Sequence, residues 1–148
     1  MRYFTRELFD AMQLGPGESD TGRAITSWQQ NVSEYRAALN ELKPRLLSGF
    51  AWLADTTLHD GVITGLDTAA SDEIVLTVDA SYNPWGQTGT VILRFEGIQS
   101  SSGLENCVDD VWLYEELHEC EDAHEVCVLL ETGEIRIAAK SLTVACEL

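Results

Sequence analysis

The hydrophobic pattern changes period near residue 55, and this change constrains the fold more than any other feature of the chain. Before it, six apolar residues recur at alternating spacings of three and four, which aligns them on one helix face: Ile25, Trp28, Val32, Tyr35, Leu39 and Leu42. After it, apolar and polar residues alternate, as in 73–79, a pattern typical of a half-buried strand. The pattern therefore predicts a helical region at 1–55 and a β region at 56–148.

Within the helical region we expect a short helix over 5–14, ended by Gly15-Pro16-Gly17 and followed by a polar loop through Asp20. Thr21 is a plausible cap for the long amphipathic helix, and Pro44 stops that helix or opens the next one. A helical stripe then continues over 46–54, although Gly49 weakens it.

The β region predicts seven short strands, at 61–66, 73–79, 89–96, 111–119, 124–131, 134–138 and 141–146. The compositions of 82–86 and 100–103 are typical of loops, and Thr132-Gly133 makes a tight connection. With 148 residues and no long linker, the chain is expected to be one domain over 1–148. The expected fold is α+β, with N-terminal helices packed on an antiparallel sheet of about six or seven strands. Whether that sheet is open or curls toward a barrel is left undecided by the pattern.

Charge is distributed unevenly along the chain. The formal net charge is −16, of which residues 56–148 carry −15, and between Glu105 and Glu134 eleven carboxylates occur without one Lys or Arg. Such a surface repels nucleic acid and anionic membranes and attracts basic partners. We therefore expect no nucleic-acid partner and no membrane partner.

The opening residues lack an apolar run after their basic side chains, and no stretch approaches the ~18 consecutive apolar residues of a membrane span. A cytoplasmic location is therefore expected. The four cysteines, Cys107, Cys120, Cys127 and Cys146, would remain reduced there, and we interpret them as small buried apolar side chains.

Residues 117–127 combine two imidazoles, two thiols and four carboxylates. Zinc binds such ligands, so an alternative prediction is a metal site formed by His118, Cys120 and His124, with His59 as a further ligand. A three-residue turn places Cys120 opposite His124, whereas a two-residue turn places His118, Cys120 and Cys127 on one face and His124 on the other. Neither register gathers all four side chains, and apart from this zinc alternative no cofactor is expected.

Four segments resemble a family of small bacterial cytosolic proteins of unknown function: MRYFTREL at 1–8, LHDG at 58–61, WLYEE at 112–116 and LLETGEI at 129–135. The strand-turn-strand endings are loosely similar to those of immunity-type proteins that neutralise bacterial toxins. This resemblance implies no catalytic residue.

No nucleophile elbow, phosphate-binding loop or dinucleotide-binding glycine pattern occurs, so no catalytic residue is proposed. The leading interpretation is a non-catalytic binding module that engages a basic protein partner. An immunity protein or an antitoxin is the type of binding module considered. The candidate contact residues are Glu115, Glu116, Glu119, Glu121, Asp122, Trp85 and Tyr82. The alternative is a small zinc-dependent hydrolase that uses the His/Cys hairpin over 112–131. The sequence indicates neither the partner nor the oligomeric state.

Overall fold

A computed structural model describes residues 1–15 and 19–147. Its helices are α1 (Arg6–Met12), α2 (Ser19–Leu42) and α3 (Ser48–Asp55), with a 3-10 turn η1 (Lys43–Arg45) at Pro44. The strands are β1 (Gly61–Asp67), β2 (Glu73–Asp79), β3 (Thr90–Ser102), β4 (Val111–Cys120), β5 (Ala123–Leu130) and β6 (Glu134–Glu147), and a second 3-10 turn, η2 (Leu104–Asn106), precedes β4. No helix among the described residues is long and apolar enough to cross a membrane.

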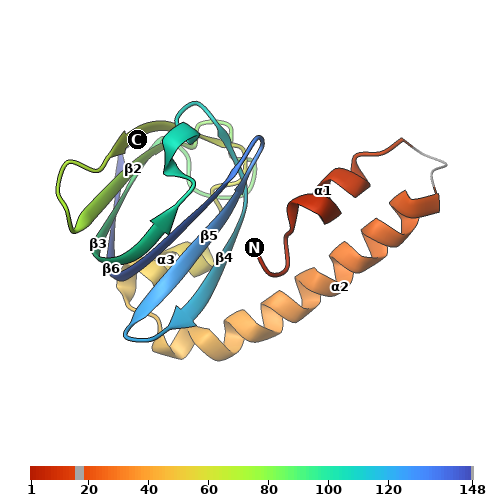
Figure 1. The fold of residues 1–148 in the computed structure, drawn as a ribbon, viewed down its shortest axis with the longest axis horizontal. Helices are drawn as coiled ribbons and strands as arrows, with labels where there is room; N and C mark the ends of the chain where they lie inside the picture. The colour runs from red at the N-terminus through yellow and green to blue at the C-terminus, as the bar shows by residue number, and fades with distance from the viewer. Residues whose placement is uncertain (16–18, 148) are drawn as a thin grey trace.

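The strands form a closed antiparallel barrel in the order β1-β2-β3-β6-β5-β4 (Figure 1), so the predicted helix-covered sheet was wrong as an architecture. Closure follows from the long strands β3 and β6. Residues 90–96 of β3 pair with β2, while β3 pairs with β6 along its whole length, across a register shift between Ile98 and Ser100. Bulges of this kind bend a strand and increase its twist, which curls the sheet until its ends meet. The closing contact is short, because β1 pairs with β4 only at Gly61 with Trp112 and Val62 with Val111.

Two of the predicted strands, 134–138 and 141–146, are parts of the single strand β6. The inward-facing positions change phase inside it, because Ile137 and Ala139 are buried on one side of Lys140 and Leu142 on the other. Lys140 lies against Gly97, which has a φ of 68° and precedes the register shift between Ile98 and Ser100. The segment predicted as a loop at 100–103 similarly continues β3 as far as Ser102.

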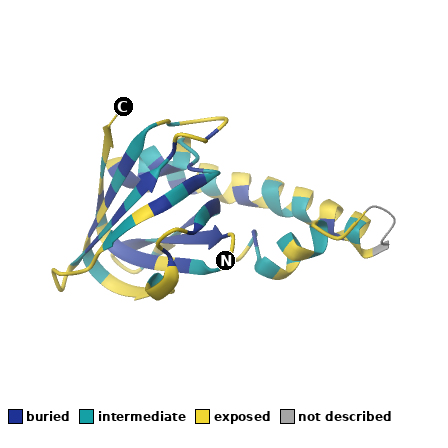
Figure 2. Cartoon of the chain, turned by 90° about the horizontal axis from the view of Figure 1, so that it is seen from above, coloured by how far each residue is buried: buried dark blue, intermediate teal, exposed yellow. Residues whose placement is uncertain are grey.

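The core is one cluster inside the barrel and beneath α3 (Figure 2). The β2 residues Ile74, Leu76 and Val78 point inward, as their alternation predicts. Phe50 and Leu53 of α3 are fully buried in the same cluster. Helix α3 can approach the barrel this closely because Gly49 has no side chain: a Cβ atom there would lie 1.8 Å from the carbonyl oxygen of Leu142.

We expect Gly49→Ala to lower the free energy of unfolding by roughly 1–3 kcal/mol, because backbone must move to admit the methyl group. Urea denaturation measures the change. Gly22→Ala is the matched control on α2, where a Cβ meets no atom within 4 Å, and it should be neutral or stabilising by up to about 1 kcal/mol. A Gly49→Ala protein as stable as the control would contradict the close packing of α3.

The helices α1 and α2 project beyond the barrel as a pair (Figure 1). Of the predicted stripe on α2, Tyr35 and Leu42 are buried, but Ile25 is 43% exposed. Trp28 packs against the aromatic rings of Phe4 and Phe9, with centroid distances of 5.1 and 6.2 Å. The stripe is therefore covered partly by N-terminal residues and not by the sheet alone. Pro16, Gly17 and Glu18, in the predicted helix stop and loop, lie outside the described residues, and Thr21 lies within the first turns of α2.

Candidate binding groove

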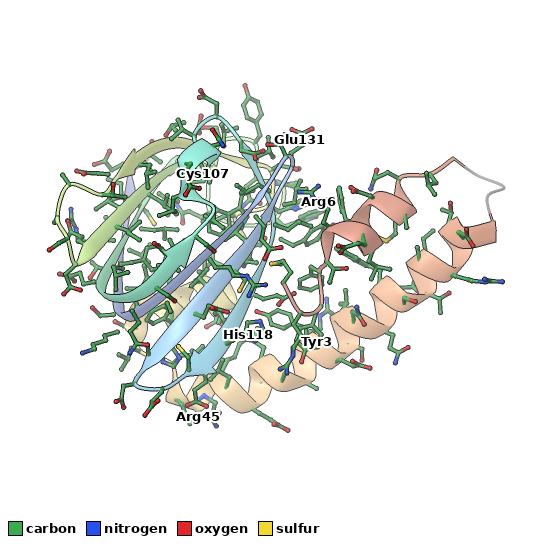
Figure 3. The ribbon with its side chains drawn as sticks, viewed as in Figure 1. Tyr3, Arg6, Arg45, Cys107, His118 and Glu131 are labelled. Carbon is green, nitrogen blue, oxygen red and sulfur yellow. The ribbon has the colours of Figure 1, made fainter. Side chains whose placement is uncertain are left out.

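The first four residues, here called the N-terminal arm, are held by one buried carboxylate on β4. Glu116 accepts the backbone N–H groups of Arg2, Tyr3 and Phe4 at 2.7, 2.6 and 2.7 Å. The Nε2 atom of His118 lies 2.8 Å from the same carboxylate, and the His118 ring stacks on Tyr3 (Figure 3). Burial tends to raise the pKa of Glu116, but these hydrogen bonds outweigh it and lower the pKa to about 2. The carboxylate therefore binds the arm in its ionised form.

Two further contacts fix the arm and α1 against the barrel. The amino group of Met1 lies 2.7 Å from Glu134. The guanidinium of Arg6 donates to the carbonyl oxygens of Leu130, Glu131 and Gly133, at the turn between β5 and β6 (Figure 3). Arg6 therefore connects α1 to the β5–β6 turn, a contact that the sequence pattern did not reveal.

A groove of about 820 Å³ lies between α2, the connection from α3 to β1, the loop from β2 to β3, and β4. We call it the α2 groove. Its aromatic and apolar lining residues include Phe4, Val32, Tyr35, Leu39, Trp85 and Tyr114, and polar and charged side chains complete the walls. Ligand sites are typically concave, mostly apolar and provided with a few polar groups. The polar group on the strand side of this groove is Glu115.

Glu115 faces the inside of the barrel wall. It pairs with Val128 of β5, whose side chain is fully buried, and paired residues place their side chains on the same face of a sheet. Because β1 begins at Gly61, opposite Trp112, β4 has no β1 partner beyond Trp112, and the side chain of Glu115 lines the α2 groove there. Burial raises the pKa of Glu115 to about 7, and the hydrogen bond that Trp112 Nε1 donates at 2.6 Å offsets this only in part. No ion pair of Glu115 occurs among residues 1–15 and 19–147.

The loop between β2 and β3 carries the most exposed large aromatic side chains of the described chain. Tyr82 is 78% exposed and Trp85 is 73% exposed. The loop is anchored by Asn83, a buried residue whose amide donates to the carbonyl of Thr57 at 2.5 Å and accepts the backbone N–H of Trp85 at 3.1 Å. The ring of His59 stacks on Trp85 at 5.2 Å and contacts Tyr114 at 5.0 Å. The aromatic side chains are thus presented to solvent by an ordered loop.

The predicted contact residues separate into different environments. Glu115 and Trp85 line the α2 groove, and Tyr82 shares the loop of Trp85. Glu121 and Asp122 are exposed at the β4–β5 turn, beside Glu119, which is ion-paired to Arg45 at 2.9 Å. Glu116 is fully buried beneath the N-terminal arm, which corrects its assignment to a contact surface.

The acidic segment from Glu105 to Glu134 does not form a continuous negative surface. Asp110 is buried and accepts the hydroxyl of Thr132 at 2.6 Å, while Glu134 pairs with the amino group of Met1 and with Arg136. Local compensation of this kind shortens the range of the acidic potential. The exposed carboxylates of the segment that remain, such as Glu105 and Glu131, lie on separate turns.

The predicted metal ligands are dispersed. Cys120 pairs with Ala123, so the turn has two residues, which is one of the two registers considered. His124 then lies on the other face from His118 and Cys120, packed against Phe50, and its Nδ1 atom has no hydrogen-bond partner. His59 contacts the carbonyl of Leu113. In the described ranges, no three His, Cys, Asp or Glu side chains are grouped so that they could hold a metal ion.

A smaller cavity of about 450 Å³ lies on the other side of the N-terminal arm, lined by Tyr3, Arg45, His118, Cys127 and Arg136 among others. Burial raises the pKa of Cys127 to about 12, and a hydrogen bond to Glu125 adds to this effect. The thiol therefore remains protonated and is a poor nucleophile. Of the cysteines interpreted as buried, Cys107 and Cys127 are buried, Cys120 is partly exposed and Cys146 is exposed.

Comparison with known proteins adds little to this geometry. An uncharacterised protein from Neisseria gonorrhoeae of known crystal structure is 12% identical, with a TM-score of 0.43 over 60% of this chain and 93% of that chain. No curated protein is significantly similar to the chain. A family model described as "Protein of unknown function (DUF4085)" matches residues 17–139. Because this match covers most of the chain, the protein belongs to that family of unknown function, in keeping with the resemblance found in its sequence.

Proposed function

We propose that this chain is a non-catalytic binding protein that recognises a basic protein partner through the β2–β3 loop and the adjoining α2 groove. The observation that carries the proposal is the exposure of Tyr82 and Trp85 on a loop held by the buried Asn83. Large aromatic side chains supply most of the energy in protein interfaces, and a rigid loop loses little conformational entropy on binding.

The partner is assigned as basic from the charge of the chain. A net charge of −16 accelerates encounter with a cationic protein and repels anionic competitors. The β4–β5 turn, with Glu121 and Asp122, contributes to this long-range attraction and lies outside the α2 groove. A basic toxin that the chain neutralises in the cytoplasm is the kind of partner that fits this surface.

The test is affinity capture from cytosol with the parent protein and with the double variant Tyr82→Ala/Trp85→Ala, followed by mass spectrometry. The parent is expected to retain a basic protein whose association slows as salt is added, and the double variant should bind that protein at least about thirtyfold more weakly. Leu47→Ala is the control, because Leu47 is also an exposed large apolar residue but lies on the α2–α3 connection. Retention of only acidic proteins, or equal binding by the double variant, would reject the proposal.

A further inference from the structure

The α2 groove has the composition of a site for an alkylammonium group. Four aromatic side chains, Phe4, Tyr35, Trp85 and Tyr114, line the same groove as the carboxylate of Glu115. Aromatic faces attract cations, and they also accommodate the apolar methylene stem that carries an ammonium group. A carboxylate among such rings supplies the counter-charge.

No neighbouring basic side chain forms an ion pair with Glu115 among the described residues. Lys43 of η1 lines the groove but is paired with Asp55 at 2.7 Å. Arg36 of α2 also lines the groove, is exposed, and forms no ion pair among the described residues. Tyr35 points its hydroxyl at the backbone N–H of Leu117, from which it accepts a hydrogen bond at 2.8 Å. Among the described residues Glu115 therefore has no ion-pair partner, and a cation that enters from solvent shares the groove with Arg36.

The geometry also discriminates between the two common cationic side chains. The Oε2 atom of Glu115 already accepts the hydrogen bond from Trp112 Nε1 at 2.6 Å, so a group that bonds both oxygens in parallel must share Oε2 with the indole. Arginine binds carboxylates best through two parallel hydrogen bonds to both oxygens. Lysine is a compact point charge that needs only one oxygen.

From these contacts we infer that the α2 groove binds a lysine side chain of the partner, with its ammonium on Glu115 and its methylene stem between Tyr35, Tyr114 and Trp85. This inference rests on the proposed function and names the group that the partner inserts. The cost of keeping Glu115 in a low-polarity wall, visible in its raised pKa, is offset when the ammonium arrives.

The experiment uses three probes on the full chain at pH 8, where Glu115 is ionised: Nα-acetyl-lysine methylamide, its norleucine analogue, which lacks the ammonium, and its arginine analogue. Binding is followed by chemical-shift changes of backbone amides. The lysine probe should bind saturably in the millimolar range, with shifts at Tyr114, Glu115 and Trp85. The norleucine and arginine probes should each bind at least about tenfold more weakly.

Glu115→Gln should abolish the preference for lysine over norleucine, whereas Glu121→Gln, at an exposed turn, should leave it unchanged. A lysine probe that binds no more tightly than norleucine, or an arginine probe that binds as tightly as lysine, overturns the inference. Capture of a basic partner through Trp85 together with a failed lysine preference would reject this inference and leave the proposed function in place. A lysine preference without any captured partner would reject the proposed function and leave the lysine selectivity of the α2 groove in place.

Discussion

Replacing Glu116 with Gln is expected to lower the free energy of unfolding by about 3 kcal/mol at pH 7. A pKa that falls from 4.5 to about 2 on folding corresponds to roughly this amount at ~1.4 kcal/mol per unit. The amide keeps one acceptor oxygen but turns N–H groups toward the N–H of Arg2 or toward His118, so buried donors lose their partner. Urea denaturation measures the loss, and amide hydrogen exchange should show the N-terminal arm and α1 opening first.

The pH dependence of the parent protein follows from the same carboxylate. The contribution of Glu116 is fully present above pH 4.5 and is lost as the pH falls toward 2, because the unfolded chain takes up the proton first. The Gln variant should therefore lose less stability than the parent between pH 5 and pH 2. Glu121→Gln on the same hairpin is the control and should change stability by less than about 0.5 kcal/mol at pH 7. A Glu116→Gln protein that matches this control would mean that the arm is not held by the carboxylate.

The helices and strands of this fold were predictable where one hydrophobic period continues along the segment. The predicted strand at 73–79 coincides with β2, and the expected helices at 5–14 and 46–54 correspond to α1 and α3. Barrel closure was not predictable, because it depends on the register shift of β3 between Ile98 and Ser100, and the nearby change of phase in β6 resembles a turn. A local hydrophobic pattern predicts which face of a sheet a side chain lies on, but it does not predict which strand the residue pairs with.

The candidate site was only partly predictable for a related reason. Glu115 and Glu116 are adjacent acidic residues with no difference that a sequence pattern can detect, yet strand alternation directs one to the groove and the other beneath the N-terminal arm. The pKa of Glu116 is lowered by His118 and by backbone N–H groups of the N-terminal arm, which are more than a hundred residues away, whereas burial raises the pKa of Glu115. The exposure of Tyr82 and Trp85 agrees with the loop composition, but the anchoring role of Asn83 needs the fold.

Glu115→Gln is expected to have the opposite effect to Glu116→Gln and to stabilise the protein by about 2 kcal/mol at pH 8. Because folding raises the pKa of Glu115 from 4.5 to about 7, its favourable contribution is complete below pH 4.5 and is lost as the pH rises through 7. At pH 8 the parent must hold a charge in a low-polarity wall, a cost that the neutral amide avoids while it still accepts the hydrogen bond of Trp112. The figure is below the full value of the shift because the groove admits water.

The comparison at two pH values makes this prediction specific to ionisation. At pH 4 the parent carboxyl is protonated, so parent and Glu115→Gln should unfold at the same urea concentration, and the difference should grow as the pH rises from 4.5 through 7 and level off above that. Glu125→Gln, on the neighbouring strand, should not reproduce this pattern. A stabilising change that also removes lysine binding is what is expected of a residue retained for function at a cost in stability. An equal gain at pH 4 and pH 8 would instead attribute the effect to packing and would remove the main electrostatic support for the α2 groove as a cation site.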